Sequence, residues 1–153
     1  MQLLIKNVKI KPSEMNIPYQ DGYMAIITEE NENLLYYKII GYPKFSKIIR
    51  NGHDRIYQTV VNRKSKQPIT SIVADLLNAK ILLDDDIKFI GKVSYHRLAK
   101  AGVKNLAIIL SGEIHVRINV DKTLEFMGPN IFENIGLFPT YGDARTWLYK
   151  LEN

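Results

Sequence analysis

The chain has 153 residues, of which 46% are hydrophobic and 24% charged, and this balance is typical of one soluble globular domain. It contains no cysteine, which excludes disulfide bonds, zinc–thiolate sites and cysteine nucleophiles. The apolar run at its start, Leu3 to Ile5, is too short for a signal peptide or a membrane span, so we expect a cytoplasmic protein.

The formal charge of +5 is unevenly distributed along the chain. From Lys38 to Lys66, eight Lys and Arg residues stand against a single acid, Asp54, so this segment carries +7 and the rest of the chain −2. Such a segment is either a solvated helix face with a basic loop, which is the commoner case, or a surface for nucleic acid or an acidic partner.

The N-terminal part of the chain predicts an extension followed by a hairpin. Residues 1–21 are predicted to be an N-terminal extension, because Pro12 and Pro18 interrupt their short apolar pattern. Residues 22–28 and 34–40 each predict a strand, and the acidic, Asn-rich loop between them favours an antiparallel hairpin.

A helix and a buried strand are predicted next. Pro43 suits the first turn of a helix, and apolar residues recur at helical spacing from there to Val60. The pair Asn51-Gly52 weakens the middle of this helix. Residues 69–77 then form an apolar run that predicts a buried strand.

The following segment predicts a capped helix and a second buried strand. Asp84 is expected to be the N-cap of a helix over 84–101, and the acids after it oppose the positive end of the helix dipole. Gly102 is placed to end this helix, and residues 105–111 predict the strand.

The C-terminal part is harder to interpret. Apolar residues alternate over 114–120, which favours a strand, although Met127 and its neighbours also permit a helical turn. Residues 135–138 predict a short last strand. Thr140 and Asp143 resemble a capping box that opens a final helix. The apolar stripe of this helix is expected to be Ala144, Trp147, Leu148 and Leu151.

This order of elements predicts the α/β class, as a single-domain mixed β-sheet with helices packed on it. Strand–helix–strand units favour parallel neighbours and right-handed crossovers, whereas the opening hairpin is antiparallel. We expect the strands at 69–77 and 105–111 to be adjacent, parallel and central in the sheet.

Two short phrases in this order of elements carry a family resemblance. They run from Lys100 to Ile109 and from Asp143 to Leu148. With the element order, they make residues 22–153 resemble the STAS/SpoIIAA-like small bacterial domains, which are related to SEC14-type domains. The resemblance implies a regulatory domain that binds another protein without being an enzyme.

In the anti-sigma-factor antagonists of that family, a strand ends in Asp and a serine near the next helix start is phosphorylated by a partner kinase. Asp75 matches the strand-end Asp, but there is no Ser or Thr between Ser71 and Ser94, so the phosphorylated serine has no counterpart. Three consecutive acids stand in its place, and helix capping alone is the alternative explanation for them. The resemblance therefore implies the candidate partner-binding residues Asp75, Asn78, Asp84, Asp85 and Asp86.

Catalytic, metal and cofactor sites are not predicted. The P-loop, the G-x-S-x-G elbow and the G-x-G-x-x-G fingerprint are all missing from the sequence. His53, His96 and His115 lack the spacing of metal ligands, and we expect His53 in a surface turn and His96 on an exposed helix stripe.

The sequence thus favours a protein-interaction module. A domain for a small apolar ligand or lipid, with its pocket between helices and sheet, is the alternative that the SEC14 side of the resemblance implies. Nucleic-acid binding by the basic segment is a third and weaker hypothesis. The partner itself is unknown.

Overall fold

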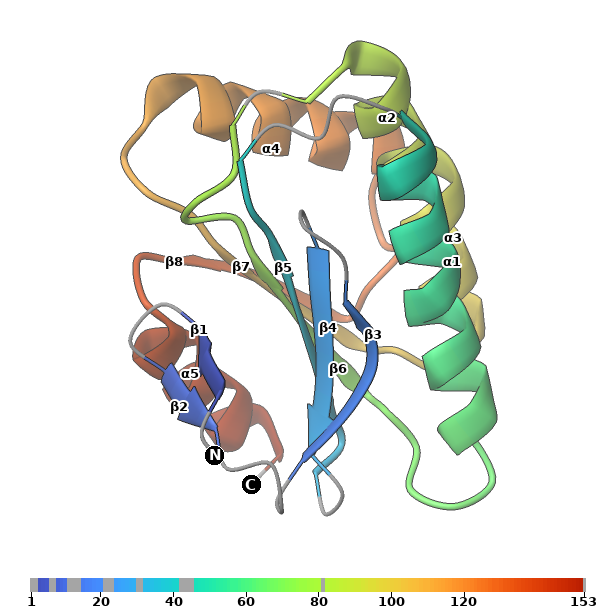
Figure 1. Cartoon of the computed structure of the whole chain (residues 1–153). Helices are drawn as coiled ribbons and strands as arrows, with labels where there is room; N and C mark the ends of the chain where they lie inside the picture. Colours follow the sequence, from blue (N-terminus) through green and yellow to red (C-terminus); the bar gives the residue numbers. More distant parts are fainter. Residues whose placement is uncertain are drawn as a thin grey trace.

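Among the residues that the structure describes, six strands form one sheet in the order β3-β4-β5-β6-β7-β8 (Figure 1). The computed structural model describes residues 3–5, 8–10, 15–20, 24–29, 32–41, 46–80 and 82–152. The strands of the sheet are β3 (Met15–Gln20), β4 (Met24–Glu29), β5 (Leu34–Ile39), β6 (Ser71–Asp75), β7 (Asn105–Ile109) and β8 (Asn134–Phe138). Within the same ranges, β1 (Leu3–Ile5) and β2 (Val8–Ile10) pair antiparallel in a separate sheet.

The sheet is mixed, as predicted. β4 pairs antiparallel with both β3 and β5, whereas β5, β6, β7 and β8 pair in parallel. β6 and β7 are adjacent, parallel and interior, which confirms the prediction for the two apolar runs. The predicted fold class, a single-domain mixed β-sheet with helices packed on it, is therefore confirmed.

Part of the predicted N-terminal extension contributes to the sheet. β3 lies within residues 1–21 and pairs antiparallel with β4, so it forms one edge of the sheet. The division of the chain at residue 22 into extension and domain stays a prediction.

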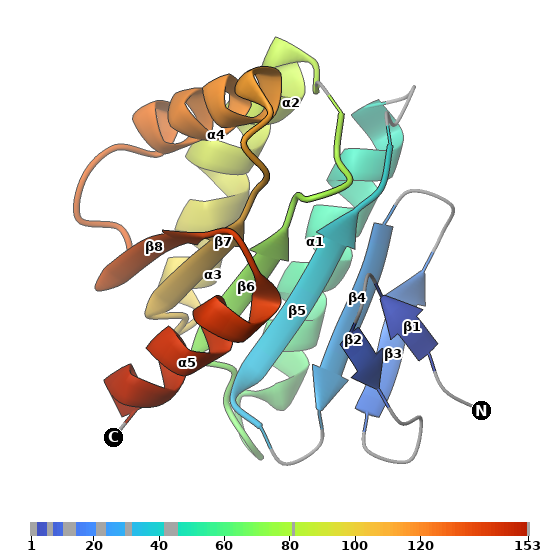
Figure 2. The same cartoon turned by 90° about the vertical axis from the view of Figure 1, so that its left-hand side faces the viewer.

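Three helical connections lie on one face of the sheet. They are α1 (Ser46–Arg63), the continuous run of α2 (Asp84–Phe89), η2 (Ile90–Ser94) and α3 (Tyr95–Lys100), and α4 (Ile114–Met127). The strands β5 to β8 follow one another across the sheet in sequence order. Because crossovers between parallel strands are right-handed, the helices that connect these strands all lie on the same face. The last helix, α5 (Tyr141–Glu152), lies on the other face (Figures 1 and 2).

Alternating side chains of the strands supply two cores. On the face of α1 to α4, the buried strand residues include Leu35, Tyr37, Ile39, Ile72, Ala74, Leu106 and Ile108. On the face of α5 they include Tyr36, Val73, Ala107 and Ile109, which pack with Ala144 and Leu148. Strands buried on both faces explain why the sequence shows continuous apolar runs here.

Glycines at two points allow close packing. Gly52 continues α1 without a break, and a Cβ at this position would overlap the Met24 sulfur, so the residue serves the contact between α1 and β4. Gly91 lies in the π-helical turn η2, where a Cβ would be 2.5 Å from the carbonyl oxygen of Thr123. This turn therefore contacts the backbone of α4 directly.

The strand predicted over 114–120 is wrong, because this segment is the start of α4. Its alternating pattern contains two helical stripes: Val116 and Val120 are buried, whereas Ile114 and Ile118 are 65% and 43% exposed. Residues four apart share a face of a helix, so the buried pair satisfies helical spacing as well as alternation.

The final helix begins as predicted. The hydroxyl oxygen of Thr140 accepts the backbone N–H of Asp143 at 3.1 Å, as expected for an N-cap. Ala144 and Leu148 are buried, but Trp147 is only partly buried and Leu151 is 41% exposed. The buried stripe of α5 is thus narrower than its apolar pattern predicts.

Candidate functional site

A groove lies outside the carboxyl ends of β5, β6 and β7, at the upper edge of the sheet in Figure 2. Ligands of open α/β sheets bind characteristically at this edge. The groove, here named the carboxyl-edge groove, has a volume of about 810 Å³. It is lined by Ile40, Gly41, Leu77, Asn78, Ala79, Lys80, Ser111, Glu113 and His115.

The floor of the carboxyl-edge groove is held by backbone hydrogen bonds beyond the strand ends. The N–H of Gly41 donates to the carbonyl of Asn78, and the N–H of Lys80 donates to the carbonyl of Gly41, both at 2.8 Å. Gly41 has a φ of 68°, a conformation that favours glycine. The loop that carries Asn78 and Lys80 is therefore fixed to the end of β5.

One wall of the groove is the start of α4. The carboxylate of Glu113 caps this helix, accepting the N–H groups of His115 and Val116 at 3.2 and 3.1 Å. The hydrogen bond from His115 is the main cause that lowers the pKa of Glu113, and the charge of Lys80 adds to it. Glu113 thus presents a negative charge beside Lys80.

Asp75 lies beneath the groove at the end of β6 and is buried. Its carboxylate accepts the hydroxyl of Tyr36 and, at 3.0 Å, the backbone N–H of Leu77. Burial first, and then the charge of Asp75, raise the pKa of Tyr36 well above its usual value. In this structure Asp75 therefore orients the loop after β6 and does not face solvent.

The acidic triplet is divided between surface and interior. Asp84 and Asp85 are exposed, and Asp84 lies 3.5 Å from the Lys122 ammonium of α4. Asp86 is buried; it accepts the Ser46 hydroxyl at 3.2 Å and its other oxygen lies 3.8 Å from Arg50 Nε. Asp86 therefore connects the starts of α1 and α2.

The predicted capping role of Asp84 is wrong. Leu83 is the N-cap of α2, without a side-chain cap, and its carbonyl accepts the N–H groups of Asp86 and Ile87 at 3.0 Å. Asp84 is the first residue inside the helix, where a carboxylate acts only through the helix dipole. Of the five predicted partner-binding residues, Asn78, Asp84 and Asp85 are thus exposed, and only Asn78 lines the groove.

His53 is not in a surface turn, because α1 continues through it and buries its ring. His53 Nδ1 and Ser94 Oγ share a hydrogen bond of 2.6 Å, and the ring lies edge-on to Tyr37 with centroids 5.4 Å apart. The hydroxyls of Tyr37 and Tyr95 share a hydrogen bond of 2.8 Å beside it. We name these four residues the His53 cluster.

The titration of the His53 cluster follows from its burial. Desolvation lowers the pKa of His53 to about 4, against a smaller opposing effect of Asp54, and raises the pKa of Tyr95 to about 12. His53 Nε2 is buried and has no hydrogen-bond partner among the residues that the structure describes. The cluster therefore contains a neutral imidazole at physiological pH.

The other histidines differ from each other. His96 is half-buried and its Nε2 lies 2.8 Å from the carbonyl oxygen of Met127, so the predicted exposed stripe is wrong there. His115 is exposed at the groove. Within the described ranges, no three His, Asp or Glu side chains gather as metal ligands would.

One small cavity lies between the sheet and the helices that cover it. A cavity of about 30 Å³ lies between β5, β7, η2 and α4, next to Tyr37 and Tyr95. This volume corresponds to roughly one water molecule. This cavity is too small to hold a lipid.

The comparisons with known proteins agree with the fold. No protein-family model and no curated protein sequence matches the chain. A solved structure, described as the overall structure of SLC26A9, is similar to 98% of this chain with a TM-score of 0.52 and 14% sequence identity. This chain spans 24% of that one, which has a STAS domain, so the similarity supports a STAS-like fold and does not extend to function. Among the described residues, no helix has the length and apolar character needed to cross a membrane.

Three residues of the groove were not predicted as site residues from the sequence: Lys80, Glu113 and His115. Glu113 precedes Val116 and Val120, whose spacing fits one face of a helix, so its position was that of a helix cap. Because the apolar residues of this segment also alternate as in a strand, the helix start could not be predicted. Lys80 follows β6 and His115 lies in the first turn of α4 after β7, and only the parallel pairing of β6 and β7 brings these two segments to one edge.

Proposed function

We propose that this chain is a cytoplasmic, non-enzymatic regulatory module with a STAS-like fold, which binds a protein partner at the carboxyl edge of its sheet. The observation that carries the proposal is the carboxyl-edge groove, which combines polar side chains with exposed apolar ones. Ile40 in its lining is 42% exposed. Ile114, which stands in the chain between the lining residues Glu113 and His115, is 65% exposed. Large exposed apolar side chains beside a groove are a common feature of protein-interaction sites.

Charges near the groove supply specificity to the proposed interface. Lys80 and Glu113 lie in its lining, and Asp84 and Asp85 are exposed at the start of α2 on the same side of the molecule (Figure 1). Complementary charges steer association and select partners more than they add affinity. A partner is therefore expected to place an apolar group at Ile114 and a basic group towards α2.

The experiment is quantitative affinity purification from the native host with tagged wild-type protein and variants. Ile114→Ser and the double variant Asp84→Asn/Asp85→Asn should each recover less of the partner. Leu151→Ser is the matched control, because Leu151 is also an exposed apolar helix residue, 41% exposed, but on α5 across the sheet. Equal recovery by all variants, each with an unchanged melting curve, would refute the proposal.

The alternative hypotheses receive less support. The cavity of about 30 Å³ between helices and sheet does not favour a lipid-binding domain. In the basic segment, the Arg50 guanidinium lies 4.6 Å from the centroid of the Phe89 ring and near the Asp86 carboxylate. This cation is therefore already engaged within the protein, which does not favour nucleic-acid binding by the segment. We therefore advance the protein-interaction module alone.

A further inference from the structure

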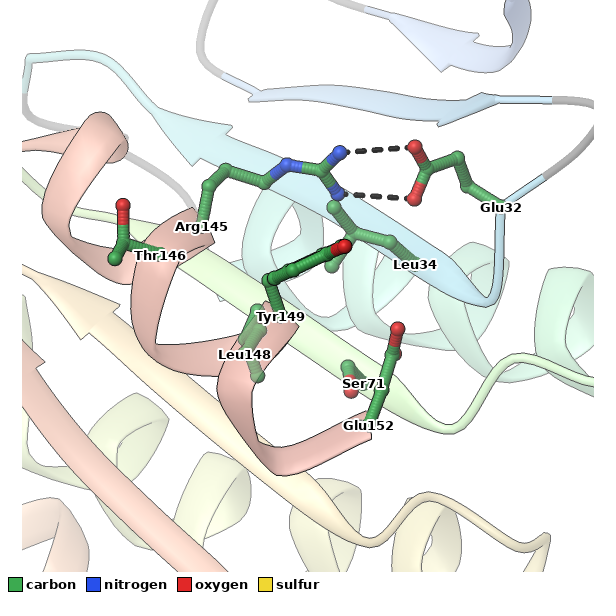
Figure 3. A pocket seen from close by; sticks show the side chains of 8 residues that line it. All are labelled: Glu32, Leu34, Ser71, Arg145, Thr146, Leu148, Tyr149 and Glu152. Atoms are coloured by element: carbon green, nitrogen blue, oxygen red, sulfur yellow. Dashed lines mark hydrogen bonds and ion pairs between the residues drawn. The ribbon is translucent and has the colours of Figure 1, made fainter.

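A second pocket lies at the opposite edge of the sheet, where the parallel strands begin. It is bounded by α5 on one side and by Glu32 and Leu34 on the other (Figure 3). Its volume is about 520 Å³. Small-molecule sites typically measure roughly 300–1,000 Å³. We name it the α5 pocket. Its lining includes Glu32, Leu34, Ser71, Arg145, Leu148 and Glu152.

Glu32, which forms one wall of the pocket, is held from both faces of the sheet. The guanidinium of Arg145 on α5 donates two hydrogen bonds to the Glu32 carboxylate, at 2.9 and 3.1 Å (Figure 3). From the other face, the guanidinium of Arg63 at the end of α1 donates to the Glu32 carbonyl at 2.8 Å. Bidentate pairs of this kind hold geometry as well as charge, so the pocket has a defined rim.

A chain of hydrogen bonds ends at the pocket. Asn134, Asn105 and Ser71 occupy paired positions at the starts of β8, β7 and β6. The amide of Asn134 donates to the Asn105 side-chain oxygen at 2.9 Å, and the amide of Asn105 donates to the Ser71 hydroxyl oxygen at 3.1 Å. Because the Ser71 oxygen accepts, its O–H is left to donate.

Ser71 lines the α5 pocket, and only 1% of its surface is exposed. Among the described residues, no side chain or carbonyl accepts its O–H. A buried donor without an acceptor is costly, and donors in a chain strengthen one another. The Ser71 hydroxyl is thus a polarised donor that faces the pocket.

The charge of the pocket comes from one carboxylate. Glu32 and Arg145 neutralise each other, whereas Glu152 has no ion pair with any residue that the structure describes. Leu34 and Leu148 supply buried apolar surface between these polar groups. The lining therefore combines a hydrogen-bond donor, an unpaired negative charge and an apolar wall.

We propose that the α5 pocket binds a small molecule that carries a protonated amine and a hydrogen-bond acceptor. The acceptor receives the Ser71 O–H, the ammonium group pairs with the Glu152 carboxylate, and the carbon skeleton packs on Leu34 and Leu148. This site lies at the sheet edge opposite the carboxyl-edge groove and does not depend on the proposed function of that groove.

The test uses aminobutanol as the probe and two-dimensional amide NMR of the whole chain, titrated at constant ionic strength into the millimolar range expected for so small a ligand. Saturable shifts should appear at Ser71, Leu34 and the second half of α5. Butylamine, which lacks the acceptor, and butanol, which lacks the charge, should each bind several-fold more weakly. No saturable shift with aminobutanol would overturn the proposal.

Variants separate the two polar anchors. Glu152→Gln should weaken aminobutanol binding about three- to fivefold, as for an exposed ion pair, and leave butanol binding unchanged. Glu125→Gln, which removes an exposed carboxylate on α4, is the matched control and should change nothing. Ser71→Ala should weaken aminobutanol but not butylamine. If Glu152→Gln binds aminobutanol as tightly as the wild type, the pairing of the ammonium group with Glu152 is refuted. This result decides the proposal even if Ser71→Ala does not fold.

Discussion

His53 should make the stability of this protein sensitive to mild acid. Its imidazole is 1% exposed, and burial lowers its pKa from 6.5 in the unfolded chain to about 4 in the folded protein. Between these two values the unfolded chain binds the proton and the folded protein does not. Stability is therefore unaffected by this residue above pH 6.5 and falls as the pH decreases through the window from 6.5 to about 4.

The magnitude follows from the width of that window. At about pH 5 the unfolded imidazole is almost fully protonated and the buried one is mostly neutral, which costs about 2 kcal/mol of unfolding free energy relative to neutral pH. Near pH 4 the loss approaches about 3 kcal/mol, a large share of the stability of a typical domain.

The assay is urea denaturation at neutral pH and at about pH 5, for wild-type protein and for His53→Asn, which removes the titrating group. The variant will be less stable at both pH values because it leaves a cavity, but its loss between them should be smaller than that of the wild type by about 2 kcal/mol. Carboxylates that titrate in both proteins cancel in this difference. Equal losses in the two proteins would refute the argument that burial keeps His53 neutral.

Three further substitutions test the packing. Gly91→Ala should lower the free energy of unfolding in urea by about 1–3 kcal/mol, because the new Cβ would overlap the backbone of α4. Gly112→Ala is the control and should cost far less, because its Cβ would have open space around it. Equal losses in the two variants would contradict the close contact at Gly91. Tyr36→Phe should cost about 1–3 kcal/mol, because it leaves an oxygen of buried Asp75 without its donor, and a neutral result would show that water replaces the hydroxyl. Trp147→Ala should lower the free energy of unfolding by less than the roughly 3–5 kcal/mol typical of a fully buried aromatic, because Trp147 is only partly buried beside Phe138. A larger loss measured by calorimetry would mean that α5 packs deeper in the core than the structure shows.

Local patterns in the sequence determined most of the architecture. The apolar runs that became β6 and β7 are buried on both faces, and such runs are readable without knowledge of their neighbours. Gly102, with a φ of 108°, follows α3, and Thr140 caps α5, because turn and cap chemistry acts over a few residues. From these signals, the order of elements and the right-handed crossover rule led to the mixed sheet.

The tertiary structure decided which polar residues face solvent. Asp86 stands in the same acidic triplet as the exposed Asp84 and Asp85, yet it is buried and accepts the Ser46 hydroxyl. Asp75 follows an apolar run and is buried with the Tyr36 hydroxyl as its donor. His53 likewise became buried because α1 packs against η2 and brings Ser94 to its ring. A sequence shows the type of a polar side chain, but its burial depends on contacts made across the fold.

The sequence by itself therefore determined the α/β class, the adjacency of β6 and β7 and the start of α5, where local chemistry is unambiguous. Only the tertiary structure decided the two candidate sites, since each gathers side chains from segments far apart in the chain. Glu32 and Arg145 meet at the α5 pocket, and Lys80 and His115 meet at the carboxyl-edge groove. The physical reason is that parallel pairing aligns the ends of strands that are separated by whole helices, and no local pattern encodes that alignment.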